Sequence, residues 1–384
     1  MRNVLFVLPR LHSNFVPNAL RLSELGIRPH FVVADSTQDF SGLFKLHLWE
    51  PSWSSADYRD VWNSAQPELL VVRQHSGWEK WFVREAKVAG IRGITYTQKP
   101  FDLTFSPGSI VSELKRAWER ARNGYPASAF SPAASLTNLR PKIFERYLPL
   151  GVEPGTQKVV ALSQQSTKVL MVAKPDHSRK RHDWLLNALS ELGIPFALTL
   201  VGLPRNLFQP TLDPSRNSEA QKDGEKYHRK IQSLIVSLGI QDHVRILAPK
   251  PFNEMAQIYQ SADVFCLPSS REPFAISPAE AMAQGVPALV SASSGAATYI
   301  QHGKTGLVFK EDDYSDFKAQ LARLLSLPKL EPGIGAQAQR YVEKHLHPHL
   351  FGVGLGKIID RRVTPLQAVR HKRYRASQVD MTTL

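Results

Sequence analysis

Short apolar runs alternate with amphipathic segments along most of the chain. In the first half, "NVLFVL" (3–8) predicts a strand, and "NFVPNALRLSELG" (14–26) predicts a helix that ends at Gly26. Further strands are predicted at 28–34, 68–74 and 92–97, with a helix at 77–90. Strand–helix–strand alternation predicts a parallel sheet covered by helices.

The same alternation restarts after residues 150–166, whose composition is that of a linker. Strands are predicted at 168–173, 196–202, 243–247, 263–268, 287–291 and 305–309, and helices at 181–193, 225–239 and 252–262, with a helix pair over 313–347. Residues 203–226 are polar and rich in Pro and Asn, which predicts a long loop. Two doubly wound α/β halves follow, and such sheets bind ligands beyond the carboxyl ends of their strands.

The chain has 384 residues, more than one compact core usually holds. We expect one domain over 1–150 and a second over 151–345. A third part, 346–384, is expected to hold a helix and a basic tail that is disordered beyond about residue 361.

The net charge of +14 favours an anionic partner: a lipid surface, a nucleic acid or a phosphorylated substrate. Part of the charge lies in the helical segment 112–122 and in "RHKRYR" (370–375), where the alternative is a solvated helix face and a frayed tail. The single cysteine, Cys266, is typical of a reducing cytoplasm. No run approaches the ~20 apolar residues of a membrane span, so a cytoplasmic protein is expected.

The segment "REPFAISPAEAMAQGVP" (271–287) follows a predicted strand and contains two glutamates, Glu272 and Glu280. Ser277 to Glu280 fits a capping box with proline at the first helical position, so Glu280 could be a cap and nothing more. The alternative is that both carboxylates frame a ligand. A helix start binds phosphate, and carboxylates accept hydrogen bonds from sugar hydroxyls, so that ligand would be a nucleotide sugar.

Two lysines lie at the same predicted edge. Lys174 follows the strand at 168–173, and Lys180 precedes the helix at 181–193. Two cations there could neutralise a diphosphate leaving group. The alternative is that both lysines are merely solvated.

Four segments of the second half match a known family in order: "VAKPDHSRKRHDWLLNAL", "LTLVG", "SADVFCLPSSREPFAISPAEAMAQGVPALVS" and "GAATYIQHGKTGLVF". Over residues 168–325 the chain resembles the retaining glycosyltransferases of the GT-B fold, family 4. The resemblance implies two Rossmann-like domains that face each other across a cleft. Residues 1–150 would form the acceptor side, and 151–345 would bind the nucleotide sugar.

The resemblance also implies a role for each matching residue. Glu272 would contact the donor sugar hydroxyls, and Glu280 would hold the ribose. Lys174 and Lys180 would stabilise the departing diphosphate. Further donor contacts are implied for Gly202 on the phosphate side, for the backbone of Phe274, Ala275 and Ile276, and for Arg245 to Leu247 at the base.

The chain departs from the family pattern at several positions. Ala275 stands where the family usually has glycine, Lys174 where it has arginine, and Thr298 where an acidic residue is common. Many members have a histidine near Gln98, and here His12 or His75 could supply that imidazole because both follow predicted strands. Strand-end histidines are also often structural or solvated.

We therefore expect an enzyme that moves a hexose-type sugar from a nucleotide-diphosphate donor to an acceptor with retention. The acceptor is a sugar or is lipid-linked, as in surface polysaccharide assembly, and the helix at 112–122 could dock on anionic lipid on the inner face of the membrane. No cofactor or metal is expected, since the spacing of His345, His347 and His349 suits no standard zinc site. The alternatives are a nucleic-acid-binding or DNA-glycosylating protein and a catalytically idle GT-B scaffold.

Overall fold

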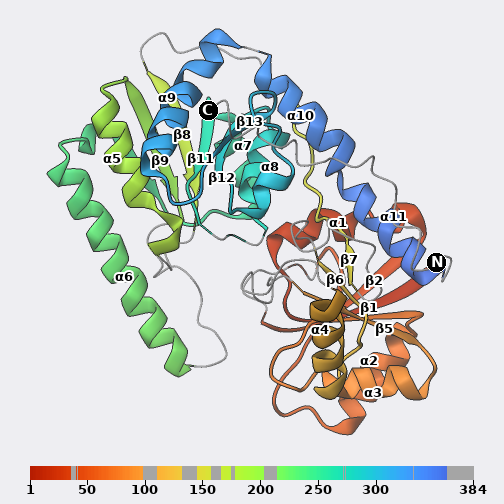
Figure 1. The fold of residues 1–384 in the computed structure, drawn as a ribbon. Helices are drawn as coiled ribbons and strands as arrows, with labels where there is room; N and C mark the ends of the chain where they lie inside the picture. Colours follow the sequence, from red (N-terminus) through yellow and green to blue (C-terminus); the bar gives the residue numbers. More distant parts are fainter. Residues whose placement is uncertain are drawn as a thin grey trace.

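The computed structural model describes residues 1–35, 40, 42–97, 110–131, 145–156, 166–173, 178–202, 214–270, 272, 274–331 and 333–360. Within these residues the chain forms two parallel sheets with helices packed on both faces of each (Figure 1). This is the predicted α/β class. It arises because the strands are continuous apolar runs that must be buried on both faces.

The first sheet has seven strands in the order β3-β2-β1-β4-β5-β6-β7. Their bounds are β1 (Arg2–Arg10), β2 (Ile27–Asp35), β3 (Lys45–Leu48), β4 (Leu69–Val72), β5 (Arg92–Tyr96), β6 (Ala129–Ser131) and β7 (Glu145–Tyr147). The chain winds outward from β1 through β3 and then returns to the other side of β1 at β4. The strand order therefore reverses between β1 and β4, which is where ligands bind in such sheets.

Strand β1 separates two apolar layers of the first domain. Phe6 and Leu8 belong to the layer under α1 (Val16–Leu20), whereas Leu5 and Val7 belong to the layer under α2 (Ser55–Ala65) and α3 (Lys80–Val88). This alternation follows from the two-residue period of a strand. The fourth helix of this domain is α4 (Ile110–Arg122).

The helix predicted over 14–26 is shorter than expected. Pro17 occupies the first turn of α1, which has five residues and is flanked by the 3-10 turns η1 (Ser13–Phe15) and η2 (Ser23–Leu25). Proline favours a helix start because it lacks an N–H group. Gly26 ends the segment as predicted, with a left-handed φ of 69°.

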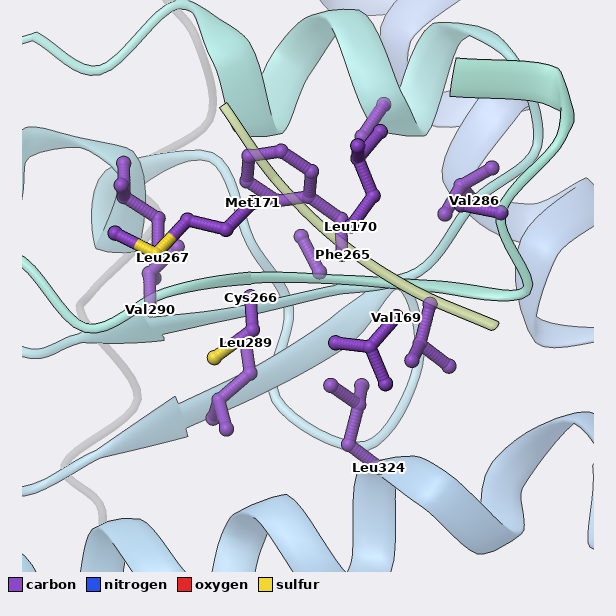
Figure 2. Close-up of a cluster of buried hydrophobic side chains, with 14 of the residues drawn as sticks. Val169, Leu170, Met171, Phe265, Cys266, Leu267, Val286, Leu289, Val290 and Leu324 are labelled. Atoms are coloured by element: carbon purple, nitrogen blue, oxygen red, sulfur yellow. The ribbon is translucent and has the colours of Figure 1, made fainter. Parts of the chain in front are cut away.

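The second sheet has six strands in the order β10-β9-β8-β11-β12-β13. Their bounds are β8 (Thr167–Val172), β9 (Phe196–Val201), β10 (Val244–Leu247), β11 (Val264–Leu267), β12 (Ala288–Ser291) and β13 (Gly306–Phe309). Figure 2 shows side chains of β8, β11 and β12 packed together above Leu324. Here the strand order reverses between β8 and β11.

Helices α5 (His182–Leu192), α6 (Pro214–Ser237), α7 (Phe252–Gln260), α8 (Ser277–Ala283), α9 (Tyr314–Leu330) and α10 (Ile334–His345) belong to the second domain. The long loop predicted over 203–226 is wrong in its second half, because α6 begins at Pro214. Proline suits a first helical turn, and the Glu, Ala, Gln and Lys residues that follow it are good helix formers. The polar residues from Pro214 onward therefore belong to a helix and not to a loop.

The chain passes between the domains twice, and the two passages are joined. The Val152 N–H donates to the Leu346 carbonyl at 2.8 Å. After this passage α11 (Pro348–Ile359) packs on the first domain beside α1, where Phe351 and Leu355 enter its core (Figure 1). The predicted C-terminal helix is thus part of the first domain's packing, and residues 361–384 lie outside the described residues.

Buried His30 on β2 predicts an acid-sensitive fold. The residue is 4 % exposed, and both ring nitrogens are buried without a hydrogen-bond partner. Burial first, and then the charges of Lys45, Arg28 and His47, lower its pKa to about 4. The unfolded chain therefore binds a proton more readily, so stability present above about pH 6.5 is lost as the pH falls toward 4.

At about 1.4 kcal/mol per pKa unit, we expect a loss of about 3 kcal/mol in the free energy of unfolding over that window. Urea titrations at pH 7.5 and pH 5 would measure about 2 kcal/mol of this loss, because pH 5 lies about 1.5 units into the window. His30→Leu should flatten most of the difference, and an equally steep pH dependence in that variant would contradict the assignment.

Candidate active site

The site residues gather at the carboxyl ends of three neighbouring strands of the second sheet, β9, β8 and β11. Beyond β11, the Ser270 N–H donates to the Arg179 carbonyl at 3.0 Å. This bond joins the segment after β11 to the turn η4 (Ser178–Lys180), which precedes α5. The two segments therefore meet over the point where the strand order reverses, as expected for a ligand site.

Lys180 and Glu272 form an ion pair at this point. Lys180 Nζ lies 2.6 Å from Glu272 Oε2, and the two side chains are 13 % and 12 % exposed. The Glu272 carbonyl also accepts the Gly295 N–H at 2.7 Å. The structure thus brings together two residues that the sequence placed 92 positions apart. A ligand with a phosphate and hydroxyls would find a cation and a hydroxyl acceptor side by side.

The predicted capping box at Ser277 is wrong. Helix α8 begins at Ser277, with Ile276 at the N-cap in an already helical conformation and without a side-chain cap. Ser277 Oγ instead donates to the Val172 carbonyl at 3.3 Å, and Glu280 Oε2 accepts from the Tyr259 hydroxyl at 2.6 Å. Each side chain is used to tie α8 to another element.

Glu280 is therefore not a helix cap. Burial raises the pKa of its carboxyl group above the usual range, and the hydrogen bond from Tyr259 only partly offsets this. Burial and the charge of Glu280 also raise the pKa of Tyr259. A carboxylate in such surroundings favours partners that donate hydrogen bonds to it.

Residues 274–276 lie where the two domains meet. The side chains of Phe274 and Ile276 pack against the apolar cores of both domains. The Ala275 carbonyl accepts a hydrogen bond from the Tyr299 hydroxyl, and the rings of Phe274 and Tyr299 lie 6.0 Å apart. The backbone that the sequence assigned to the sugar and diphosphate is thus held on the interdomain side.

Gly202 and Leu247 are directly joined at the other end of the site. Gly202 follows β9 with a φ of 111°, which favours glycine, and its N–H donates to the Leu247 carbonyl at 3.0 Å. Arg245 is exposed on β10, the edge strand beyond β9. These residues therefore follow Lys180 and Glu272 along one sheet edge.

The first-domain candidates lie beyond the carboxyl ends of β1 and β4. His12 is partly buried, and its carbonyl accepts the Phe15 N–H at 2.8 Å. His75 is exposed; its N–H donates to Glu79 at 2.5 Å, and its ring Nδ1 lies 3.1 Å from Ser76 Oγ. Gln98 and Lys174 lie outside the described residues.

Arg181, beside Lys180, was not identified from the sequence. It has a left-handed φ of 53° at the N-cap of α5, and its guanidinium pairs with Asp312 and lies 4.1 Å from the Trp184 ring centroid. Asp312 has a left-handed φ of 57° as well. Two strained residues that hold each other fix the direction of the chain at Lys180, and no sequence pattern indicates such a conformation for a non-glycine residue.

Two further properties concern only the residues that the structure describes. No group of three or more His, Cys, Asp or Glu side chains among them is arranged to hold a metal ion. None of the helices formed by the same residues is both long and apolar enough to cross a membrane.

Comparison with known proteins shows which family the second domain resembles. Residues 155–341 match the family described as glycosyl transferases group 1. Two curated relatives are D-inositol 3-phosphate glycosyltransferases. That of Thermomonospora curvata is 34 % identical over 128 residues, 33 % of this chain and 28 % of the relative. That of Rhodococcus erythropolis is 27 % identical over 225 residues, which cover 57 % of this chain and 45 % of the relative. The matches thus span less than half of either relative.

Solved structures resemble the whole chain. Sucrose-phosphate synthase from Thermosynechococcus elongatus gives a TM-score of 0.68 at 17 % identity, with 94 % of this chain and 99 % of the other covered. Anabaena HepE, solved in complex with UDP and glucose, gives a TM-score of 0.70 at 12 % identity, with 94 % of this chain and 100 % of HepE covered. The fold is therefore GT-B, as predicted, and residues 155–341 of this chain are similar to the group 1 glycosyl transferases.

Proposed function

We propose that this protein is a glycosyltransferase that moves a hexose-type sugar from a nucleotide-diphosphate donor to an acceptor with retention of configuration. The observation that carries the proposal is the Lys180–Glu272 pair at the strand-order reversal of a domain similar to the group 1 glycosyl transferases. The second domain binds the donor, and the first domain provides the acceptor side.

Each site residue takes a defined part in this reaction. Glu272 accepts hydrogen bonds from the donor sugar, Glu280 holds the ribose, and the backbone of residues 274–276 follows the sugar and diphosphate. Lys180, with Lys174, stabilises the charge on the departing diphosphate. As the bond between the sugar and phosphate oxygen breaks, the acceptor oxygen attacks on the same face. Its proton passes to the leaving diphosphate.

The cations of the protein perform the task that a metal ion performs in other enzymes, so we propose that turnover needs no metal. The proposed donor carries uridine, since HepE has been solved with UDP and with UDP-glucose. Activity that EDTA abolishes and Mg²⁺ restores would contradict the proposal that turnover needs no metal.

A thermal-shift screen tests the donor site. A ligand that binds only the native state stabilises it and so raises the melting temperature. At a ligand concentration of 100 times Kd, the free energy of unfolding increases by about 2.7 kcal/mol. We expect UDP and one UDP-sugar to raise it most among nucleotide diphosphates. If no nucleotide diphosphate shifts the melting temperature, the donor proposal fails. Binding of the donor without hydrolysis or transfer would instead identify an idle GT-B scaffold.

A cytoplasmic, lipid-linked acceptor of surface polysaccharide assembly is the finer proposal, and it is supported by α4. Leu114 and Trp118 are 46 % and 58 % exposed on this basic helix, and the Arg122 guanidinium lies 5.2 Å from the Trp118 ring centroid. Apolar side chains among cations are typical of a helix that rests on anionic lipid.

Liposome flotation tests this surface. We expect recovery with vesicles that contain phosphatidylglycerol to exceed recovery with phosphatidylcholine vesicles severalfold, and Trp118→Ser with Arg122→Gln to remove the difference. The exposed Arg84→Gln on α3 is the charge-matched control. Equal recovery with both vesicle types would exclude membrane docking by α4.

A further inference from the structure

The Glu280 carboxylate has two oxygens, and one of them is held by a buried side chain. Oε2 accepts the Tyr259 hydroxyl at 2.6 Å, whereas Oε1 has no hydrogen-bond partner among the residues that the structure describes. Tyr259 is 2 % exposed, but Glu280 keeps part of its surface open to solvent. A ligand can therefore reach the Glu280 carboxylate but not the hydroxyl behind it.

Tyr259 is itself fixed by its surroundings. It lies in the last turn of α7, its ring belongs to the apolar core of the second domain, and the ring centroid lies 6.0 Å from that of Phe265. Burial and the charge of Glu280 raise the pKa of its hydroxyl, so the hydroxyl stays protonated and donates to the carboxylate. A packed side chain with one buried donor can fix the orientation of the group that it contacts.

Helix α7 bonds to α8 at two points, and only one of them lies near the site (Figure 1). The Tyr259 bond reaches Glu280 in the first turn of α8, whereas Gln260 Nε2 donates at 2.9 Å to Oε1 of Gln284, the C-cap of the same helix. Gln284 also donates to the Glu153 carbonyl in the interdomain linker at 3.5 Å. The Gln260 bond is therefore a structural tie with which the Tyr259 bond can be compared.

A structural tie at Tyr259 would not need a carboxylate. Burial raises the pKa of the Glu280 carboxyl group, and the hydrogen bond from Tyr259 only partly offsets this effect. An uncharged amide would accept the same hydroxyl without placing a charge in these surroundings. A carboxylate with one oxygen held and the other open suits a ligand that brings its own hydroxyl donor.

We propose that Tyr259 is a positioning residue for the donor nucleotide, which holds Glu280 Oε2 and so presents Oε1 to one hydroxyl of the ribose. The inference rests on the proposed function, which assigns the ribose to Glu280. It adds that the chain selects a ribonucleotide over a deoxyribonucleotide through a residue that the donor never touches. A carboxylate that turned freely would lose part of this hydrogen bond to the entropy of ordering the side chain.

Isothermal titration of the full chain with UDP, 2′-deoxy-UDP and 3′-deoxy-UDP measures this selection. We expect the native chain to bind one of the two deoxynucleotides about tenfold more weakly than UDP, the effect of losing a hydrogen bond to a charged group. Tyr259→Phe keeps the ring and removes only the hydroxyl, and it should reduce this ratio to below about threefold. Gln260→Met breaks the other bond between α7 and α8 and should leave the ratio unchanged.

A double variant tests whether Tyr259 acts through Glu280. In the Glu280→Gln background, Tyr259→Phe should change UDP affinity less than about twofold, because effects that pass through one group do not add. If the hydroxyl served the fold alone, its removal would weaken UDP binding equally in both backgrounds. Calorimetric melting of each variant confirms that it is folded.

The pH dependence of UDP binding gives a readout that a loss of packing would not move. Tyr259 lowers the pKa of Glu280, so Tyr259→Phe lets that carboxyl group take up a proton at a higher pH. As the pH falls, this variant should therefore lose UDP affinity at a higher pH than the native chain, while the phosphates of UDP titrate alike in both. Tyr299, the other ionisable group beside this pair, donates to the Ala275 carbonyl and is present in both chains.

The outcomes separate this inference from the proposed function. An unchanged deoxynucleotide ratio in Tyr259→Phe, an effect that adds to that of Glu280→Gln, or an unchanged pH dependence overturns the inference. Normal UDP binding by a native chain that does not distinguish UDP from its deoxy analogues also overturns this inference alone. Failure of the native chain to bind UDP overturns the proposed function, and the inference with it.

Discussion

Replacing Lys180 with methionine lowers kcat about 10²–10³-fold, the expected effect of removing one preorganised charge from a developing anion. Glu272→Gln has an effect of similar size, because the amide neither holds Lys180 as an ion pair nor accepts sugar hydroxyls as strongly. Both side chains keep some solvent exposure, so the fold survives either change. Transfer kinetics with the donor found by thermal shift, together with circular dichroism, measure the two effects separately.

The ion pair itself allows a sharper control. If Lys180 and Glu272 were only a structural pair, the double variant Lys180→Met/Glu272→Gln would remove both charges and recover function, since the loss in each single variant would come from an unpaired half-buried charge. If the residues act on the substrate, the double variant stays inactive. Lys318→Met breaks the exposed Lys318–Glu191 pair of the same domain and should leave kcat unchanged. Near-normal turnover in Lys180→Met would sink the site assignment.

The apolar strands of the second sheet were predicted well from the sequence because buried parallel strands are continuous apolar runs. The very short strands β6 and β7, three residues each, carry too little pattern to be predicted. The start of helix α6 is not predicted by the sequence pattern, because its polar residues are equally typical of a loop. Polarity indicates exposure to solvent, and an exposed helix and an exposed loop share it.

The capping pattern shows most clearly what spacing alone cannot decide. Ser54 and Asp57 at the start of α2 form a true capping box, in which the Ser54 side chain accepts from the Asp57 N–H and Asp57 accepts from the Ser54 N–H at 2.6 Å. Ser277 and Glu280 have the same spacing, yet they bond to β8 and to Tyr259. The difference lies in tertiary partners that are distant in sequence. The contacts that position these site residues therefore cannot be predicted from their local spacing.

Those contacts give Glu280 an effect on stability opposite to that of a cap. Its carboxyl pKa is raised by burial, so the folded chain takes up a proton more readily than the unfolded chain, and the ionised group destabilises the fold at neutral pH. Glu280→Gln keeps an acceptor for the Tyr259 hydroxyl and removes the charge. We therefore expect the ligand-free variant to melt higher than the native chain at pH 7.5, by an amount that shrinks as the pH falls toward 4.5.

Donor binding should change in the opposite direction, because under the proposed function a ribose hydroxyl loses a charged acceptor worth about 1–3 kcal/mol, or roughly 5–150-fold in the Kd of UDP. Glu254→Gln on the exposed side of α7 removes the same charge and should alter neither quantity. Calorimetric melting and UDP titration on one preparation of each variant measure both effects. A cap would lose stability and leave UDP affinity unchanged, so that result would return Glu280 to a purely structural role. If Glu280→Gln melts higher and binds UDP more weakly, the Glu280 carboxylate destabilises the fold but is needed to bind the ligand.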